Sequence, residues 1–117
     1  MKPATLNLTI RRGVSFGPVT ITGRDLAGAL VPLAGWSAFS QVRLAPGEAV
    51  VLDFAPLIAA DDAAGIVTLP EVTWAVTATL ADGVYFWDLI LQTPAGRRLD
   101  PCISGTVTVL TPTTLPT

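Results

Sequence analysis

The chain of 117 residues contains no histidine, which removes the side chain that most often acts as a general base or a metal ligand. A nucleophile would have no imidazole beside it, so the usual catalytic triad is excluded. Cys102 is the only cysteine, so no disulfide forms within the chain, and we expect it to be buried and inert. Glycine-rich phosphate loops are also missing. We therefore expect a protein without enzymatic activity and without a cofactor.

Charged residues are scarce as well, at 14% of the chain, against roughly 25% in an average domain. The net charge of −2 and the scattered arginines give no electrostatic footprint for nucleic acid. No run approaches the roughly 18 apolar residues of a membrane-spanning helix. The start, Met1-Lys2-Pro3-Ala4-Thr5, lacks the apolar segment of a signal peptide. We expect synthesis in the cytoplasm, with residence there or assembly from there, and no membrane insertion.

Apolar residues, by contrast, make up 50% of the chain. A chain of this length is expected to form one domain with a single core. One core of that size cannot bury so many apolar side chains, so some must lie at the surface or in an interface. This composition predicts a homo-oligomer or a module that docks to a larger body.

Short stretches of alternating apolar and polar residues, separated by glycine, proline and aspartate turns, predict about seven or eight strands. Such spacing is typical of a β-sandwich and not of a βαβ fold. Residues 84–92 are apolar on both faces, which predicts a central strand. Residues 111–117 are rich in threonine and proline and predict an extended tail, so we expect a sandwich domain over residues 1–110 followed by that tail.

The segment Leu80-Ala81-Asp82-Gly83-Val84-Tyr85 has the spacing of a tyrosine corner, in which a turn precedes a tyrosine whose hydroxyl reaches back to nearby backbone. Gly83 and Tyr85 are its structural residues. This device predicts the fold class: an all-β, Greek-key, immunoglobulin-like sandwich. Because a tyrosine corner is usually approached by an irregular crossing segment, residues 71–79 favour a short helical turn beginning near Thr73, although their alternation also fits a strand.

Asp88 lies in an otherwise apolar strand, and a buried carboxylate needs a partner. Arg43, near the end of another predicted strand, is the candidate, and we expect a bidentate pair across the sheet. A catalytic role is the alternative. A single acid without a second acid or a base favours the structural role.

Asp61 and Asp62, with Asp53, raise the question of a calcium site, because hard cations prefer several oxygen ligands. No further acidic residue stands at ligand spacing. We therefore favour a solvated loop tip and expect no metal.

The three tryptophans more often fill a core or an interface than bind a sugar. Trp74, in the crossing segment, is the strongest candidate for an exposed contact. Trp36 and Leu115 are the other interface candidates, the latter because we expect the tail to contact neighbouring proteins.

From its first strand to its last, the chain carries a series of spaced motifs: Leu6-x-Leu8-x-Ile10-x-Arg12-Gly13-x-x-Phe16, Leu33-x-Gly35-Trp36, Gln41-Val42-Arg43, Asp62-x-x-Gly65-x-Val67-x-Leu69, Leu80-x-x-Gly83-x-Tyr85-x-x-Asp88-Leu89, Pro94-x-Gly96 and Gly105-x-Val107-x-Val109. This order resembles small immunoglobulin-like proteins of tailed bacteriophages and prophages, in particular the N-terminal domain of phage baseplate upper proteins. The resemblance covers nearly the whole chain, mostly through glycines and turn positions. It implies a virion building block with no catalytic residues.

Baseplate upper proteins continue into a long receptor-binding or stalk region, whereas this sequence stops at Thr117, which favours an adaptor or connector over a fibre. We therefore expect a structural protein of the virion, assembled in the bacterial cytoplasm as a homo-oligomer and docked to other virion proteins of the tail or baseplate. Two alternatives stay open: a capsid decoration or head-attached protein, and a module for host-surface carbohydrate. The last would need exposed aromatics beside polar groups, as Trp74 with Glu71 and Thr73 offers, or Trp36.

Overall fold

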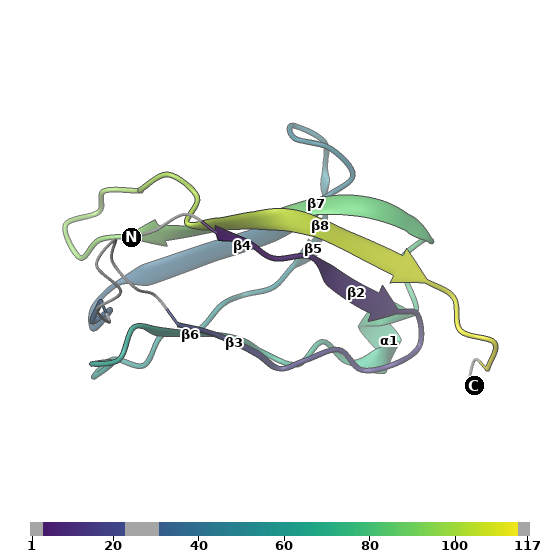
Figure 1. Cartoon of the computed structure of the whole chain (residues 1–117), viewed down its shortest axis with the longest axis horizontal. Helices are drawn as coiled ribbons and strands as arrows, with labels where there is room; N and C mark the ends of the chain where they lie inside the picture. The colour runs from purple at the N-terminus through teal and green to yellow at the C-terminus, as the bar shows by residue number, and fades with distance from the viewer. Residues whose placement is uncertain (1–3, 23–30, 115–117) are drawn as a thin grey trace.

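The structure is a computed structural model that describes residues 4–22 and 31–114. Within these ranges lie eight strands and one short helix, stacked in two layers (Figure 1). In chain order they are β1 (Ala4–Thr5), β2 (Leu8–Arg11), β3 (Val19–Thr22), β4 (Ser37–Arg43), β5 (Val50–Asp53), β6 (Ile66–Leu69), α1 (Trp74–Thr77), β7 (Gly83–Gln92) and β8 (Ile103–Leu110).

The larger layer is a mixed sheet in the order β1-β8-β7-β4-β5, with β2 also paired to β8. β7 runs antiparallel to both of its neighbours, whereas β1 and β2 lie parallel to β8. The smaller layer pairs β3 with β6 in an antiparallel arrangement. The all-β prediction is therefore confirmed, and so is the central position of the strand predicted over residues 84–92.

The core lies between the two sheets and follows the alternation of side chains along each strand. On β7, Tyr85, Trp87, Leu89 and Leu91 point inward and are buried. The ring of Phe54 meets the Trp87 indole edge-on, with centroids 5.7 Å apart. The outward side of β7 carries Phe86, Asp88 and Ile90 and is not covered by a second layer. β7 is therefore central because it has a strand on each edge, and not because a layer covers each of its faces.

The approach to β7 matches the predicted crossing segment. A single helical turn, α1, begins after Thr73, and the Thr77 hydroxyl donates to the Val14 carbonyl oxygen at 3.0 Å. The hydroxyl of Tyr85 donates to the Ala81 carbonyl oxygen at 2.7 Å, which is the backbone contact expected of this tyrosine. The first bond ties α1 to the segment that follows β2, and the second fixes the turn that leads into β7.

The break between β1 and β2 is fixed by contacts across Gly105. The Leu6 carbonyl oxygen accepts a hydrogen bond from the Trp87 indole N–H at 2.8 Å. The Asn7 amide oxygen accepts from the backbone N–H of Thr106 at 3.1 Å and from its hydroxyl at 3.2 Å. A β-carbon at position 105 would overlap the Leu6 backbone, so only glycine lets the first strands pass this closely.

Beyond β8, the described part of the predicted tail, residues 111–114, forms no helix or strand. The Thr111 hydroxyl bonds to Asp82 and accepts from Arg12, whose other terminal nitrogen donates to the Ala78 carbonyl oxygen at 3.2 Å. The tail therefore leaves the sandwich beside the end of α1. Leu115 lies outside the described residues.

We expect Gly105→Ala to lower the free energy of unfolding by about 1–3 kcal/mol, because the new methyl group must push the Leu6 backbone away from Trp87. Thermal and denaturant unfolding measure this loss. The matched control is Ser104→Ala, an exposed position one residue earlier, for which we expect a change within about 0.5 kcal/mol. Equal stability of the two variants would contradict the close passage described above.

Candidate binding surfaces

The face of the larger sheet that points away from β3 and β6 carries a groove of about 650 Å³. Its floor is formed by alternate residues of β7 and β4, and the loop between β4 and β5 stands beside it, projecting from the sheet (Figure 1). We call this the sheet groove. The residues that line it include Asn7, Gln41, Arg43, Phe86, Asp88, Ile90, Ser104 and Thr106.

The strand register decides which groups meet in the sheet groove. Asp88 stands between Gln41 on β4 and Ser104 on β8, and the next outward row places Phe86 between Arg43 and Thr106. The outward side chains of β7 are therefore aromatic, acidic and aliphatic in turn. Phe86 is 47% exposed, although its strand supplies four buried side chains to the core.

The predicted bidentate pair between Arg43 and Asp88 is wrong. Among the described residues, the Arg43 guanidinium donates to the Glu48 carbonyl oxygen and, at 2.7 Å, to the Gln41 side-chain oxygen, and no ion pair joins it to Asp88. The reason is the register, which puts Arg43 opposite Phe86 and only diagonal to Asp88. Asp88 is also half-buried on an open sheet face, so it is not the fully buried acid that the prediction assumed.

The electrostatic environment of Asp88 follows from this placement. Partial burial raises the pKa of Asp88, and the positive charge of Arg43 opposes that rise. Within the described ranges no donor group lies at hydrogen-bond distance from its carboxylate. The sheet groove therefore holds one unpartnered acceptor and one cation whose terminal nitrogens are already engaged.

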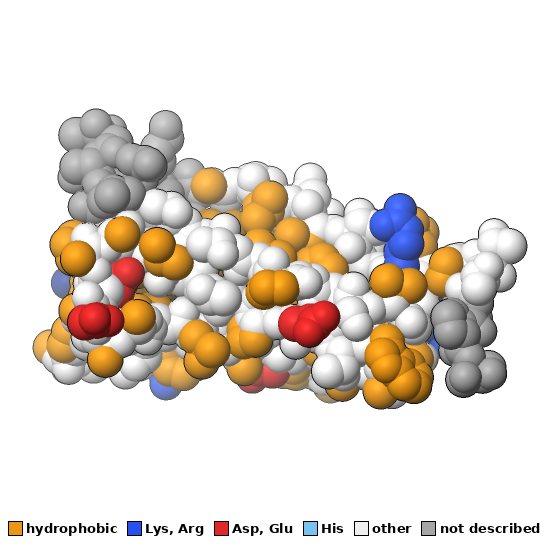
Figure 2. Space-filling view, turned by 90° about the horizontal axis from the view of Figure 1, so that it is seen from below, with side chains coloured by type: hydrophobic (Ala, Val, Ile, Leu, Met, Phe, Trp, Pro, Cys, Tyr) orange, Lys and Arg blue, Asp and Glu red, His pale blue; other side chains and the backbone are white. Residues whose placement is uncertain are grey.

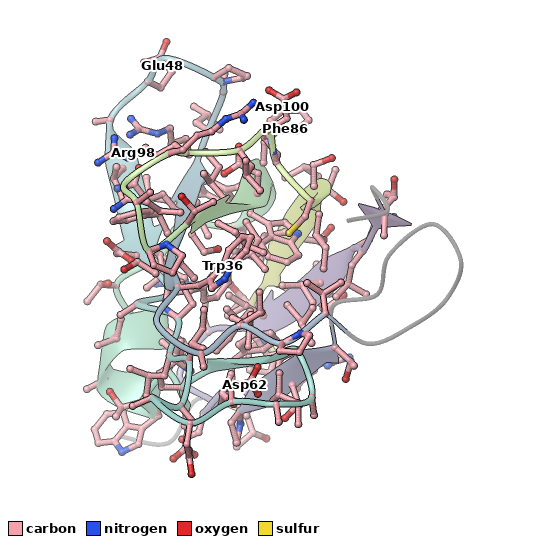
Figure 3. The ribbon with its side chains drawn as sticks, turned by 90° about the vertical axis from the view of Figure 1, so that its left-hand side faces the viewer. Trp36, Glu48, Asp62, Phe86, Arg98 and Asp100 are labelled. Carbon is pink, nitrogen blue, oxygen red and sulfur yellow. The ribbon has the colours of Figure 1, made fainter. Side chains whose placement is uncertain are left out.

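A second hollow, of about 300 Å³, continues from the sheet groove and shares Gln41, Asp88 and Ile90 with it. At its far side the Arg98 guanidinium lies 5.0 Å from the centre of the Phe39 ring, and its Nε donates to the Gln92 side-chain oxygen at 3.0 Å. Figure 3 shows Phe86 and Arg98 on the same side of the molecule as Glu48, with Asp62 on the other side. The two hollows together form a continuous path between two aromatic rings.

Asp62 has a structural role that the sequence analysis missed. The favoured solvated loop tip is wrong for this residue: its carboxylate is buried and accepts the N–H groups of Leu33 and Gly65, each at 2.9 Å, and of Ile66 at 3.2 Å. Burial opposes its ionisation, but these hydrogen bonds outweigh burial, so the pKa of Asp62 lies below its ordinary value. The spacing Asp62-x-x-Gly65 was the available signal.

Neither Asp53 nor Asp61 joins Asp62 in a metal site. In residues 4–22 and 31–114, no three acidic or cysteine side chains gather in a way that would hold a metal ion. The Cys102 thiol is buried, as expected, and contacts the Leu89 carbonyl oxygen at 3.5 Å. Burial raises the pKa of this thiol, which keeps it in its unreactive form.

Exposed apolar side chains also surround α1. Trp74 is 56% exposed, and Val76 in the same helical turn and Val14, whose carbonyl oxygen accepts from Thr77 of α1, are exposed as well. We call these three residues the end patch. Figure 2 shows hydrophobic side chains spread along this face, with one group near the end of the molecule where the described chain finishes. Trp36, in contrast, is partly buried and packs against the core, so it does not offer the exposed contact considered for it.

We expect Asp62→Ala to lower the melting temperature by roughly 5–10 °C near neutral pH, because three backbone N–H groups lose their acceptor. Since the folded state lowers the pKa of Asp62, its contribution is complete above the ordinary aspartate value of 3.8 and is lost as the pH falls through the lower folded-state pKa. The difference in melting temperature between the natural chain and the variant should therefore shrink below that pH.

The control for this measurement is Asp61→Ala, which removes an exposed neighbouring carboxylate. Its effect on the melting temperature should be small. An Asp62→Ala variant whose deficit grew as the pH fell would contradict the assignment of Asp62 as an ionised hydrogen-bond acceptor.

Comparison with models of known protein families and with curated proteins finds no match for this chain. In the described part of the structure, no helix has the length and apolar character needed to cross a membrane. What the molecule does must therefore be inferred from its two surfaces, the sheet groove and the end patch.

Proposed function

We propose that this chain is a non-enzymatic structural protein of a tailed-phage or prophage particle, an immunoglobulin-like Greek-key sandwich that self-associates and docks to other virion proteins as a tail or baseplate adaptor. The strand order supports the fold part of this proposal, since the first strands pair with the last strand in the larger sheet and the Tyr85 hydroxyl bonds to the backbone of the segment that leads into β7. The sequence resemblance supports the virion part.

The end patch is the observation that carries the assembly function. A tryptophan side chain that is more than half exposed is costly to leave in water and is typical of a contact surface, and Val76 and Val14 add exposed apolar area near α1. Because the tail leaves the sandwich beside α1, a second copy that covers Trp74 also meets residues 111–114.

We expect sedimentation velocity to show reversible self-association of the natural chain, and Trp74→Ser to weaken it at least about tenfold by exposing a hydroxyl where an aromatic anchor packed. Leu57→Ser is the matched control, because Leu57 is 60% exposed on another part of the surface. A natural chain that stays monomeric at high concentration, or equal weakening by the two variants, would contradict a contact through the end patch.

A separate measurement tests the place in the particle. Quantitative mass spectrometry of purified particles from the source counts the copies of this chain per particle. A few to a few dozen copies support the adaptor function, whereas hundreds favour capsid decoration. Particles without this chain would remove the virion function altogether.

A further inference from the structure

The sheet groove has no part in the self-association proposed above, and its chemistry points to a ligand. We infer that it binds a neutral oligosaccharide, laid along the outward side of β7 from Phe86 to Phe39. This inference is independent of the virion proposal, because it rests on the groups that line the sheet groove.

The hydrogen-bonding groups of the sheet groove match the hydroxyls of a sugar. The Asp88 carboxylate is an acceptor that no donor of the described chain satisfies. Gln41 and Asn7 use their amide oxygens on Arg43 and Thr106, which leaves the amide NH₂ groups as donors. A hydroxyl both donates and accepts, so a polyol can satisfy the carboxylate and the amides at once.

Charged groups on the path also bear on the ligand. One carboxylate, on Asp88, lies at its centre, with the Arg43 guanidinium on one side and the Arg98 guanidinium at the Phe39 end. An anionic ligand would meet the negative charge of Asp88, and both guanidiniums already donate to groups of the chain, Arg43 to Glu48 and Gln41 and Arg98 to Gln92. A cationic ligand would meet the positive charge of Arg43 beside Asp88. Both considerations favour an uncharged ligand.

The shape and apolar surface of the sheet groove also suit a sugar chain. A volume of about 650 Å³ lies within the range of small-ligand sites, roughly 300–1,000 Å³. Phe86 offers an exposed aromatic ring, and the connected hollow ends at Phe39. Phe86 and Ile90, which stands opposite Phe39, are four residues apart on one strand, or about 13 Å. A sugar ring presents an apolar C–H face and a polar hydroxyl rim. A short chain of sugars therefore fits a floor that is apolar at Phe86, polar at Asp88 and apolar again at Ile90 and Phe39.

The projecting loop between β4 and β5 argues against a protein as the occupant. It stands on the same side of the sheet and closes one flank of the sheet groove with Pro46 and Gly47 (Figure 1). A stable protein interface buries about 800 Å² on each partner, which requires a broad and accessible surface. A slender ligand enters beside the loop without moving it.

The test uses the ¹⁵N-labelled full chain, titrated separately with maltotetraose, cellotetraose and tetra-N-acetylchitotetraose up to about 10 mM and followed by amide chemical shifts. We expect at least one of these neutral tetrasaccharides to shift the signals of Gln41, Phe86 and Ser104. Phe86→Ala and Asp88→Ala should each weaken binding about tenfold or more, and both positions are on the open face, so both variants should fold. Trp74→Ser, at the end patch, should bind as the natural chain does.

Several results would overturn the inference. One is the absence of shifts in the sheet groove with all three sugars. Another is binding that survives both groove variants, which would place the sugar elsewhere. A third is tighter binding of the anionic tetragalacturonate than of any neutral sugar. Finally, if these signals move only as the concentration of the chain itself rises, the occupant is a second copy and not a carbohydrate.

Discussion

The alternation of side chains along β7 is the constraint on which both the core and the sheet groove depend. Tyr85, Trp87, Leu89 and Leu91 face the smaller sheet, and Phe86, Asp88 and Ile90 face outward. A shift by one residue in the pairing of β7 with its neighbours would exchange these two sets, exposing the tryptophan and burying the acid. Because β7 is hydrogen-bonded along both edges, to β4 and to β8, this exchange is prevented over its whole length.

Trp87 couples this strand to the start of the chain. Its indole N–H would be an unsatisfied donor in the core if the Leu6 carbonyl did not turn toward it, and that turn is what separates β1 from β2. Gly105 leaves room for this turn of the Leu6 backbone. The Asn7 side-chain oxygen accepts from the backbone N–H of Thr106, which would otherwise lack an acceptor there. One buried aromatic side chain thus determines how the first strands lie on the last one, and it sets one wall of the sheet groove.

Local patterns in the sequence correctly predicted the structural features that depend only on residues close together in the chain. Thr73 and the turn at Gly83 were enough to place α1 and the hydrogen bond of Tyr85, because both are short-range features. The pair between Arg43 and Asp88 failed because it depends on the register between two strands 45 residues apart, which alternation alone does not set. Asp62 was missed because one of its partners, Leu33, belongs to a distant loop that comes close only in the folded chain. The sheet groove was missed for the same reason, since four strands contribute to it.

The positions of the two surfaces bear on the adaptor function proposed above. The end patch surrounds α1 and the start of the tail, whereas the sheet groove lies on the outward face of the larger sheet. They share no residue, so occupation of one leaves the groups of the other available. The three side chains of the end patch are apolar, which suits a contact between proteins formed by burying aromatic and aliphatic surface. The sheet groove has a polar centre between aromatic rings, which suits a reversible and weaker ligand. A chain poor in charge can therefore carry two distinct recognition chemistries, because a single sandwich separates them in space.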